Sequence, residues 1–176
     1  VLVAEGTTLD GAPLGPWMVP TERIAELLTT GVIDNGDGTF SYDVSFNPSA
    51  FRDAVETLRD GLFRPAQNAR FEFVEETGQL QVLQPSVDER RLNVPATLAN
   101  MESQVFDASN RIVPIDFDYT LAQFHSGLTA AELGITELVA QGTSSYAGSS
   151  RPRIENILQA MSRFNGLIIR PGEEFS

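Results

Sequence analysis

The chain has 176 residues, of which 41% are hydrophobic and 20% are charged. These values are typical of soluble globular proteins, and the length suits one domain or one domain and part of a second. The formal net charge of −12 argues against nucleic-acid binding, which needs clustered Lys and Arg. All twelve basic residues are Arg and there is no Cys, so lysine Schiff bases, thiolate nucleophiles and disulfides are excluded.

The first part of the chain predicts a short strand, a loop and a helix. A strand is expected near Leu2–Ala4, followed by a loop rich in Gly and Pro that carries Trp17. From Pro20 the apolar residues recur at helical spacing, so we expect a helix that ends at Gly31. Its predicted apolar face consists of Ile24, Leu27 and Leu28.

A turn, a strand and a second helix are expected next. Residues 34–38 have the composition of a turn. The alternation over Phe40–Phe46 predicts a half-buried strand, with Tyr42 packed in the core. Asn47 is a predicted N-cap, and Pro48 suits the first helical position. The apolar face of this helix contains Phe51, Ala54, Val55, Leu58 and Leu62.

The middle of the chain completes a β-α-β-β-α-β order. Residues 70–84 predict a hairpin, a helix is expected after Asn93, and residues 112–117 predict a strand at a sheet edge because Pro114 cannot donate to a ladder. We therefore expect an α+β fold, with a mixed or antiparallel sheet covered by helices on one face and a possible split βαβ, ferredoxin-like core over 40–118. The predicted buried core is Phe51, Val55, Leu58, Leu98, Met101 and Val105.

The last third predicts a short helix after Thr129, a strand at 135–139 and a loop over 142–150. A longer helix over 152–164 and a short strand at 167–169 follow, and Pro171-Gly172 predicts a further turn. The apolar face of the longer helix consists of Ile154, Ile157, Leu158 and Met161.

Residues 143–176 contain several irregular features in a fixed order. These are a Thr/Ser-rich start, an Arg-x-x-Asn-Ile helix, an Asn-Gly turn and a Pro-Gly-Glu-x-Phe-Ser end. In this order and composition the segment resembles the opening of the VanW family. The matching positions are Arg153, Asn156, Ile157, Asn165, Gly166, Pro171, Gly172, Glu173, Phe175 and Ser176.

The preceding region resembles the peptidoglycan-binding-like domain that commonly comes before VanW. The resemblance rests on an entry at Trp17, a helix after Asn47-Pro48, a Gly-containing hairpin, Pro85-Ser86 and a second helix, although residues 87–92 depart from the Gly and Asp-Leu found in many of these proteins. It implies a domain over 1–142 and the truncated start of a VanW domain over 143–176. It also implies an extracellular, cell-wall-associated protein whose membrane anchor lies outside this chain.

The chemistry-bearing residues are candidates for binding rather than for catalysis. His125 is the single histidine, which excludes multi-histidine zinc sites, and no Gly-x-Ser-x-Gly elbow is present. We expect no enzyme activity, metal or cofactor in this chain. Trp17 could stack on sugar rings, while Arg90 and Arg91 could grip stem-peptide carboxylates. Arg153 and Asn156 have either a structural or a ligand-contacting role.

Two functions remain open at this point. The chain is either a non-catalytic module that binds peptidoglycan and presents a VanW domain, or a structural spacer and interaction scaffold that binds no glycan. The net charge of −12 favours the spacer slightly, because cell walls are rich in anionic groups.

Overall fold

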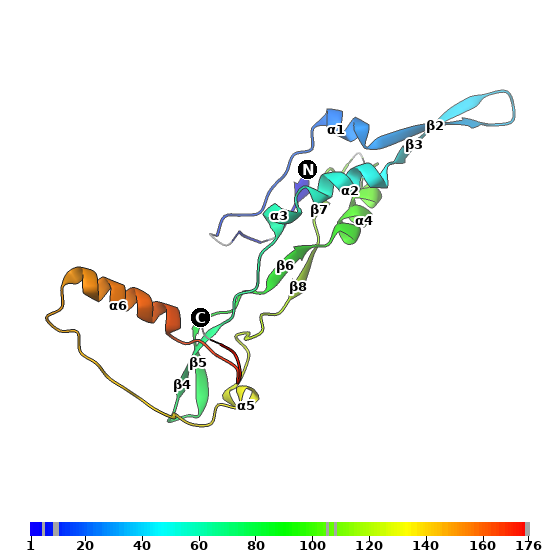
Figure 1. The fold of residues 1–176 in the computed structure, drawn as a ribbon. Helices are drawn as coiled ribbons and strands as arrows, with labels where there is room; N and C mark the ends of the chain where they lie inside the picture. Colours follow the sequence, from blue (N-terminus) through cyan, green and yellow to red (C-terminus); the bar gives the residue numbers. More distant parts are fainter. Residues whose placement is uncertain (5, 9–10, 105, 108, 175–176) are drawn as a thin grey trace. The chain divides into compact units, whose positions relative to one another are not determined.

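The computed structural model describes residues 1–4, 6–8, 11–104, 106–107 and 109–174 (Figure 1). With 28% helix and 26% strand in small sheets, the fold class is α+β, as the sequence predicts. The chain forms two compact units. Unit 1 comprises Val1–Arg64 and Arg90–Tyr119, and unit 2 comprises Pro65–Glu89 and Thr120–Ser176. The 1–142 and 143–176 division that the resemblance implies stays a prediction.

Unit 1 packs its helices against short strands and carries one long hairpin. β1 (Leu2–Val3) pairs in parallel with β7 (Val113–Pro114), and β2 (Leu28–Asp34) pairs antiparallel with β3 (Phe40–Phe46). The helices are α1 (Thr21–Glu26), α2 (Pro48–Glu56), α3 (Arg59–Leu62) and α4 (Val94–Gln104). β6 (Glu89–Leu92) pairs with β8 (Phe117–Thr120).

Two asparagine caps fix the starts of the main helices of this unit. Asn47 Oδ1 accepts a 3.3 Å hydrogen bond from the Ala50 amide, and Asn93 Oδ1 accepts one of 2.9 Å from Ala96. These bonds satisfy amides that have no partner within the helix. Both predicted N-termini are therefore confirmed.

The core of unit 1 lies between α2, α4 and the β1–β7 pair. Of the predicted core residues, Phe51, Val55, Leu98 and Met101 are buried, whereas Leu58 is half-buried. The sixth, Val105, lies outside the described residues. The remaining buried members of this cluster are Leu2, Leu14, Leu27, Leu62, Leu92, Val94 and Ile115.

Unit 2 is built from a hairpin and segments near the end of the chain. β4 (Arg70–Val74) and β5 (Gln79–Gln84) form the predicted hairpin. α5 (Ala130–Leu133) begins at Thr129 with a capping box, in which Thr129 and Glu132 bond to each other's backbone amides. α6 (Arg151–Phe164) is the predicted long helix. The small core of this unit comprises Ala69, Phe71 and Phe124, with Leu80, Leu128, Leu133 and Ile168 packed against them.

The predicted four-stranded sheet over 40–118 is wrong. In the part of the chain that the structure describes, each sheet has two strands, and β3 pairs with β2 rather than with the 70–84 hairpin. The ferredoxin-like core is therefore not confirmed. The predicted 112–117 strand is divided between β7 and β8, and Pro114 does lie at a sheet edge.

The difference from the predicted sheet begins in the first helix, for which the sequence predicts an end at Gly31. α1 ends at Glu26 instead, and Leu28–Asp34 is a strand. This segment holds two threonines, a valine and an isoleucine before an Asp-Asn-Gly turn. β-Branched residues favour strands, and the turn joins them to a second alternating run, so hairpin pairing prevails over helical spacing.

The β2–β3 hairpin extends away from the helices of unit 1 (Figure 1). Several of its apolar side chains are consequently exposed: Tyr42, predicted to be core, is 82% exposed, and Phe40 is 67% exposed, whereas Phe46 at the base packs against the core. The alternation correctly predicted the strand, but alternation alone does not show that a second layer covers the apolar face.

Two predicted strands near the end of the chain are absent. Residues 135–139 and 167–169 are irregular in the structure. In the first segment Leu138 and Val139 are exposed, so the apolar run does not reflect burial. On the apolar face of α6, Leu158 and Met161 are exposed and Ile154 and Ile157 are half-buried, so no side chain of this helix is fully buried within the described structure.

Candidate functional site

Trp17 lies beside β1 rather than free in its loop. Its amide donates to the Leu2 carbonyl, and the Leu2 amide donates to the Trp17 carbonyl, both at 2.9 Å. The indole is half-buried, packs against the core of unit 1 and lies over Gly15, where an added Cβ would be 2.7 Å from the ring. Trp17 is therefore partly a packing residue, and less of its ring is available for sugar stacking than a loop position suggests.

Arg90, a predicted ligand-binding residue, lies inside unit 1 and makes structural contacts there. The side chain is 2% exposed. Its Nε donates to the Leu62 carbonyl at 3.1 Å, its Nη1 donates to the Thr7 carbonyl at 3.0 Å, and the guanidinium lies 5.0 Å from the centre of the Phe117 ring. Burial lowers the pKa of Arg90 from its ordinary value, and the positive charge of Arg64 lowers it further. The buried guanidinium thus contacts three segments of unit 1, those that contain Leu62, Thr7 and Phe117.

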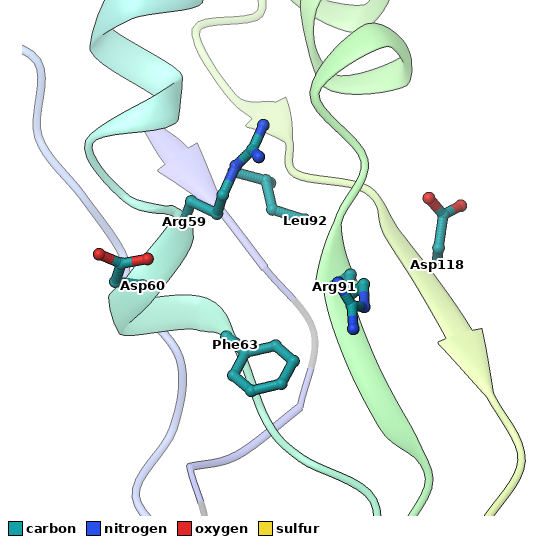
Figure 2. Close-up of a pocket in the computed structure, with 6 residues that line it drawn as sticks. All are labelled: Arg59, Asp60, Phe63, Arg91, Leu92 and Asp118. Atoms are coloured by element: carbon teal, nitrogen blue, oxygen red, sulfur yellow. The ribbon is translucent and has the colours of Figure 1, made fainter.

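Arg91 has the opposite environment, because neighbouring residues of a strand face opposite sides. It is exposed, and its guanidinium lies 5.4 Å from the centre of the Phe63 ring. It lines a hollow of about 460 Å³ (Figure 2). The residues around this hollow are Arg59, Asp60, Phe63, Arg91, Leu92 and Asp118.

The hollow combines both signs of charge with an aromatic ring. Arg59 and Asp60 come from α3 and Asp118 from β8, while Phe63 follows α3 and lies between Asp60 and Arg91 in this view (Figure 2). Arg59 lies 3.4 Å from Glu56, and Asp118 Oδ1 accepts a 2.8 Å hydrogen bond from Asn93. Guanidinium groups suit carboxylates, whereas carboxylates suit amines and hydroxyls. The hollow can therefore contact a ligand that carries both kinds of group.

The three predicted binding residues do not form one site. Arg91 lines the hollow, Arg90 is buried on the other side of β6, and Trp17 is not among the residues around the hollow. Arg59, Phe63 and Asp118 also line the hollow, and none of them was predicted from the sequence as a binding residue. The one available signal was the Arg59-Asp60-x-x-Phe63 spacing, which places these side chains on about one turn of helix.

The Asn165-Gly166 turn, one of the motif positions quoted above, has a packing role in unit 2. Gly166 adopts φ = +75°, and an added Cβ would lie 2.9 Å from Arg70 Cβ and 3.0 Å from the backbone N and O of Phe71. The Phe71 amide donates to the Gly166 carbonyl at 3.0 Å. Close approach to β4 therefore requires glycine at this position.

Arg70 of β4 makes a second contact with the end of α6. Its Nη1 donates to the carbonyls of Ser162 at 2.6 Å, Arg163 at 3.2 Å and Asn165 at 2.9 Å. These bonds occupy carbonyls at the helix C-terminus, where the helix dipole favours a cation. Arg70 thus acts as a C-terminal cap supplied by a strand far away in sequence.

The other motif residues lie on turns or on the helix surface. Pro171 and Gly172 form the predicted turn, in which the Arg170 amide donates to Glu173 Oε2 at 2.9 Å. Arg153 and Asn156 are exposed on α6. Phe175 lies outside the described residues.

The described residues contain no group of three or more His, Cys, Asp or Glu side chains arranged to hold a metal ion. His125 Nδ1 accepts a 3.2 Å hydrogen bond from the Gly127 amide, which ties it to its own loop. Within the same described ranges, no helix is long and apolar enough to cross a membrane.

Comparisons with protein-family models, with curated proteins and with solved structures gave no match for this chain. The resemblance to the VanW family and to its preceding domain therefore stays a prediction from the residues quoted above.

Proposed function

We propose that this chain is a non-catalytic, extracellular module that binds peptidoglycan in the cell wall. The observation that supports the proposal is the hollow in unit 1, where exposed Arg91 lies beside Phe63 with Arg59, Asp60 and Asp118 around it. The proposal also rests on the resemblance to wall-associated domains.

The chemistry of the hollow fits the peptide part of peptidoglycan better than its sugars. Stem peptides carry carboxylates, which the guanidinium groups of Arg59 and Arg91 can bind through paired hydrogen bonds. Asp60 and Asp118 can accept hydrogen bonds from amines and amides of the same peptide. The Phe63 ring adds an apolar surface for aliphatic side chains.

A second function is favoured by a different observation. Trp17 is half-buried and Arg90 is buried, so the sugar-stacking and paired-arginine site expected from the sequence is not assembled. The net charge of −12 also opposes binding to an anionic wall. A structural spacer that holds a VanW domain at a distance from the membrane needs no ligand site, and it is the alternative.

Co-sedimentation with purified, protein-free sacculi at several salt concentrations separates the two functions. Wall binding predicts that the wild-type chain pellets with sacculi and that Arg59→Gln/Arg91→Gln reduces the bound fraction at least several-fold. Arg52→Gln/Arg23→Gln is the matched control, because it removes the same charge from exposed positions of unit 1 that do not line the hollow. If the wild-type chain stays in the supernatant at every salt concentration, with or without calcium, the spacer function replaces the proposal.

A further inference from the structure

The β2–β3 hairpin of unit 1 presents an apolar face to solvent. Residues that pair directly, and every second residue along each strand, lie on the same face of a hairpin. The face defined in this way consists of Thr30, Val32, Asp34, Phe40, Tyr42 and Val44. Its four apolar side chains are between 45% and 82% exposed. Because a hairpin alone is only marginally stable in water, this face is suited to carry a helix as a second layer.

The charges of this hairpin are all negative. Asp34 lies on the apolar face where the hairpin approaches its turn, Asp37 lies in the turn, and Asp43 is on the opposite face. Residues 28–46 contain no Lys or Arg. A helix that complements this face should therefore place a positive charge near Asp34 and apolar side chains farther from the turn.

α6 of unit 2 has a matching pattern. Its apolar face is formed by Ile154, Ile157, Leu158 and Met161, and the last two are 50% and 59% exposed. Leu158 and Met161 also border an open hollow of about 820 Å³, which has room for an aromatic ring. Arg153 is exposed and lies four residues before Ile157, so it flanks the apolar face near the start of the helix. With three Arg and one Glu, α6 has the opposite net charge to the hairpin.

The spacing between charge and apolar residues is similar on the two faces. A helix rises about 1.5 Å per residue, so Met161 lies about 12 Å along the axis from Arg153. A strand rises about 3.4 Å per residue, so the paired residues Thr30 and Val44 lie about 14 Å from Asp34. An arginine–aspartate contact near the turn would therefore bring the apolar side chains of the helix over those of the hairpin.

We propose that α6 of a second copy of this chain covers the apolar face of the hairpin. Arg153 of one copy pairs with Asp34 of the other, and the apolar side chains of α6 pack on Tyr42 and Val44. The two sides of the contact are different, so every copy offers one hairpin and one helix. Because the contact is small, the association is weak and reversible. The proposal does not depend on wall binding, since none of these residues lines the hollow around Arg91.

Sedimentation velocity between about 10 μM and about 1 mM tests the association, over a range suited to a small interface. The wild-type chain should form dimers or larger species as its concentration rises. The hairpin variant Tyr42→Ser/Val44→Ser should stay monomeric, and so should the helix variant Leu158→Ser/Met161→Ser. Ile33→Ser, on the opposite face of the hairpin, is the matched control and should associate like the wild-type chain. All five positions are exposed, so these substitutions leave the fold intact.

An equimolar mixture of the hairpin variant and the helix variant distinguishes this contact from other pairings. The helix variant keeps the hairpin face and the hairpin variant keeps α6, so the mixture should form a one-to-one dimer that does not grow further. Association of the helix variant alone would show that hairpins pair with each other, and association of the hairpin variant alone would show that helices pair. Either result would overturn the proposal, as would a mixture or a wild-type chain that stays monomeric at about 1 mM.

Two further substitutions test the ion pair in the same mixture. Asp34→Asn in the helix variant keeps the hydrogen bond from the Gly36 amide but removes the charge. This change and Arg153→Gln in the hairpin variant should each weaken the mixed dimer several-fold. Combining them should weaken it no further, because they remove one interaction. Arg163→Gln, on the opposite side of α6, should have no effect; an equal effect there, or additive losses at Asp34 and Arg153, would overturn the proposed contact.

Discussion

Replacing Gly166 with alanine should detach the end of α6 from β4. Alanine at φ = +75° costs about 1–2 kcal/mol of backbone strain. The new Cβ would also lie 2.9 Å from Arg70 Cβ and 3.0 Å from the backbone of Phe71, closer than carbon atoms normally approach. Relief of this clash separates the two segments and breaks the Phe71–Gly166 hydrogen bond, whose net contribution is about 0.5–1.5 kcal/mol.

The expected total for Gly166→Ala is roughly 2–4 kcal/mol, from the sum of strain, contact and hydrogen-bond losses. Gly172→Ala is the matched control, because Gly172 has φ = +85° but no neighbouring atom within 4 Å of the point where an added Cβ would lie. It should cost the strain alone, about 1–2 kcal/mol.

Urea denaturation of the full chain measures both free energies of unfolding, and hydrogen exchange locates the change. In Gly166→Ala the Phe71 amide should lose protection, whereas in Gly172→Ala it should keep it. Equal destabilisation by the two substitutions, with Phe71 still protected in both, would refute the packing role of the Asn-Gly turn.

Three other substitutions and one titration test the remaining structure. Arg90→Ala should lower the free energy of unfolding by roughly 2–4 kcal/mol, because it leaves two carbonyls without donors; a loss below about 0.5 kcal/mol would show that the guanidinium is not structural. Leu62→Ala should cost about 2–5 kcal/mol in the same measurement, while Tyr42→Ala on the exposed hairpin should cost less than about 1 kcal/mol. The backbone and side-chain hydrogen bonds from Thr129 lower the pKa of Glu132, so its carboxylate should titrate by NMR below the ordinary value of about 4.3. Stability from this cap is present above the ordinary pKa and lost as pH falls through the lowered one, so α5 should fray in acid; an unshifted titration would contradict the capping box.

Local signals in the sequence predicted the starts of three helices, α2, α4 and α5. Asn47-Pro48 and Asn93 mark helix starts because their side chains cap free amides, and both caps are present. Thr129 and Glu132 have the spacing of a capping box, and α5 begins there. Such signals act over a few residues, so they do not depend on the rest of the fold.

Strand pairing and burial could not be predicted in the same way. The alternation of Phe40–Phe46 predicts a strand. Its partner is β2, but the helical spacing that begins at Ile24 and Leu27 predicted a helix, not a strand, in the first part of that segment. Tyr42 shows that an alternating apolar face can be left uncovered. These properties depend on which distant segments meet, and one sequence without that information does not determine them.

The candidate site shows the same difference between local signals, which the sequence reveals, and contacts between distant segments, which it does not. Arg90 and Arg91 look equivalent in the sequence, yet the strand places one inside unit 1 and the other at the hollow. Phe63 and Asp118 join Arg91 only through the fold, so no local pattern predicts the set. Gly166 was singled out because it matches a motif position of the family that the sequence resembles. Its contact with β4 explains why glycine is needed there.

The proposed binding of wall peptides by Arg91 and its neighbours can be followed by NMR of the arginine side chains. Twelve arginines give twelve Nε–H signals, which can be followed while soluble muropeptides are added. We predict saturable shifts at Arg59 and Arg91, with Arg52 unchanged. Arg52 alone shifting, or no arginine signal moving at millimolar muropeptide, would contradict the claim.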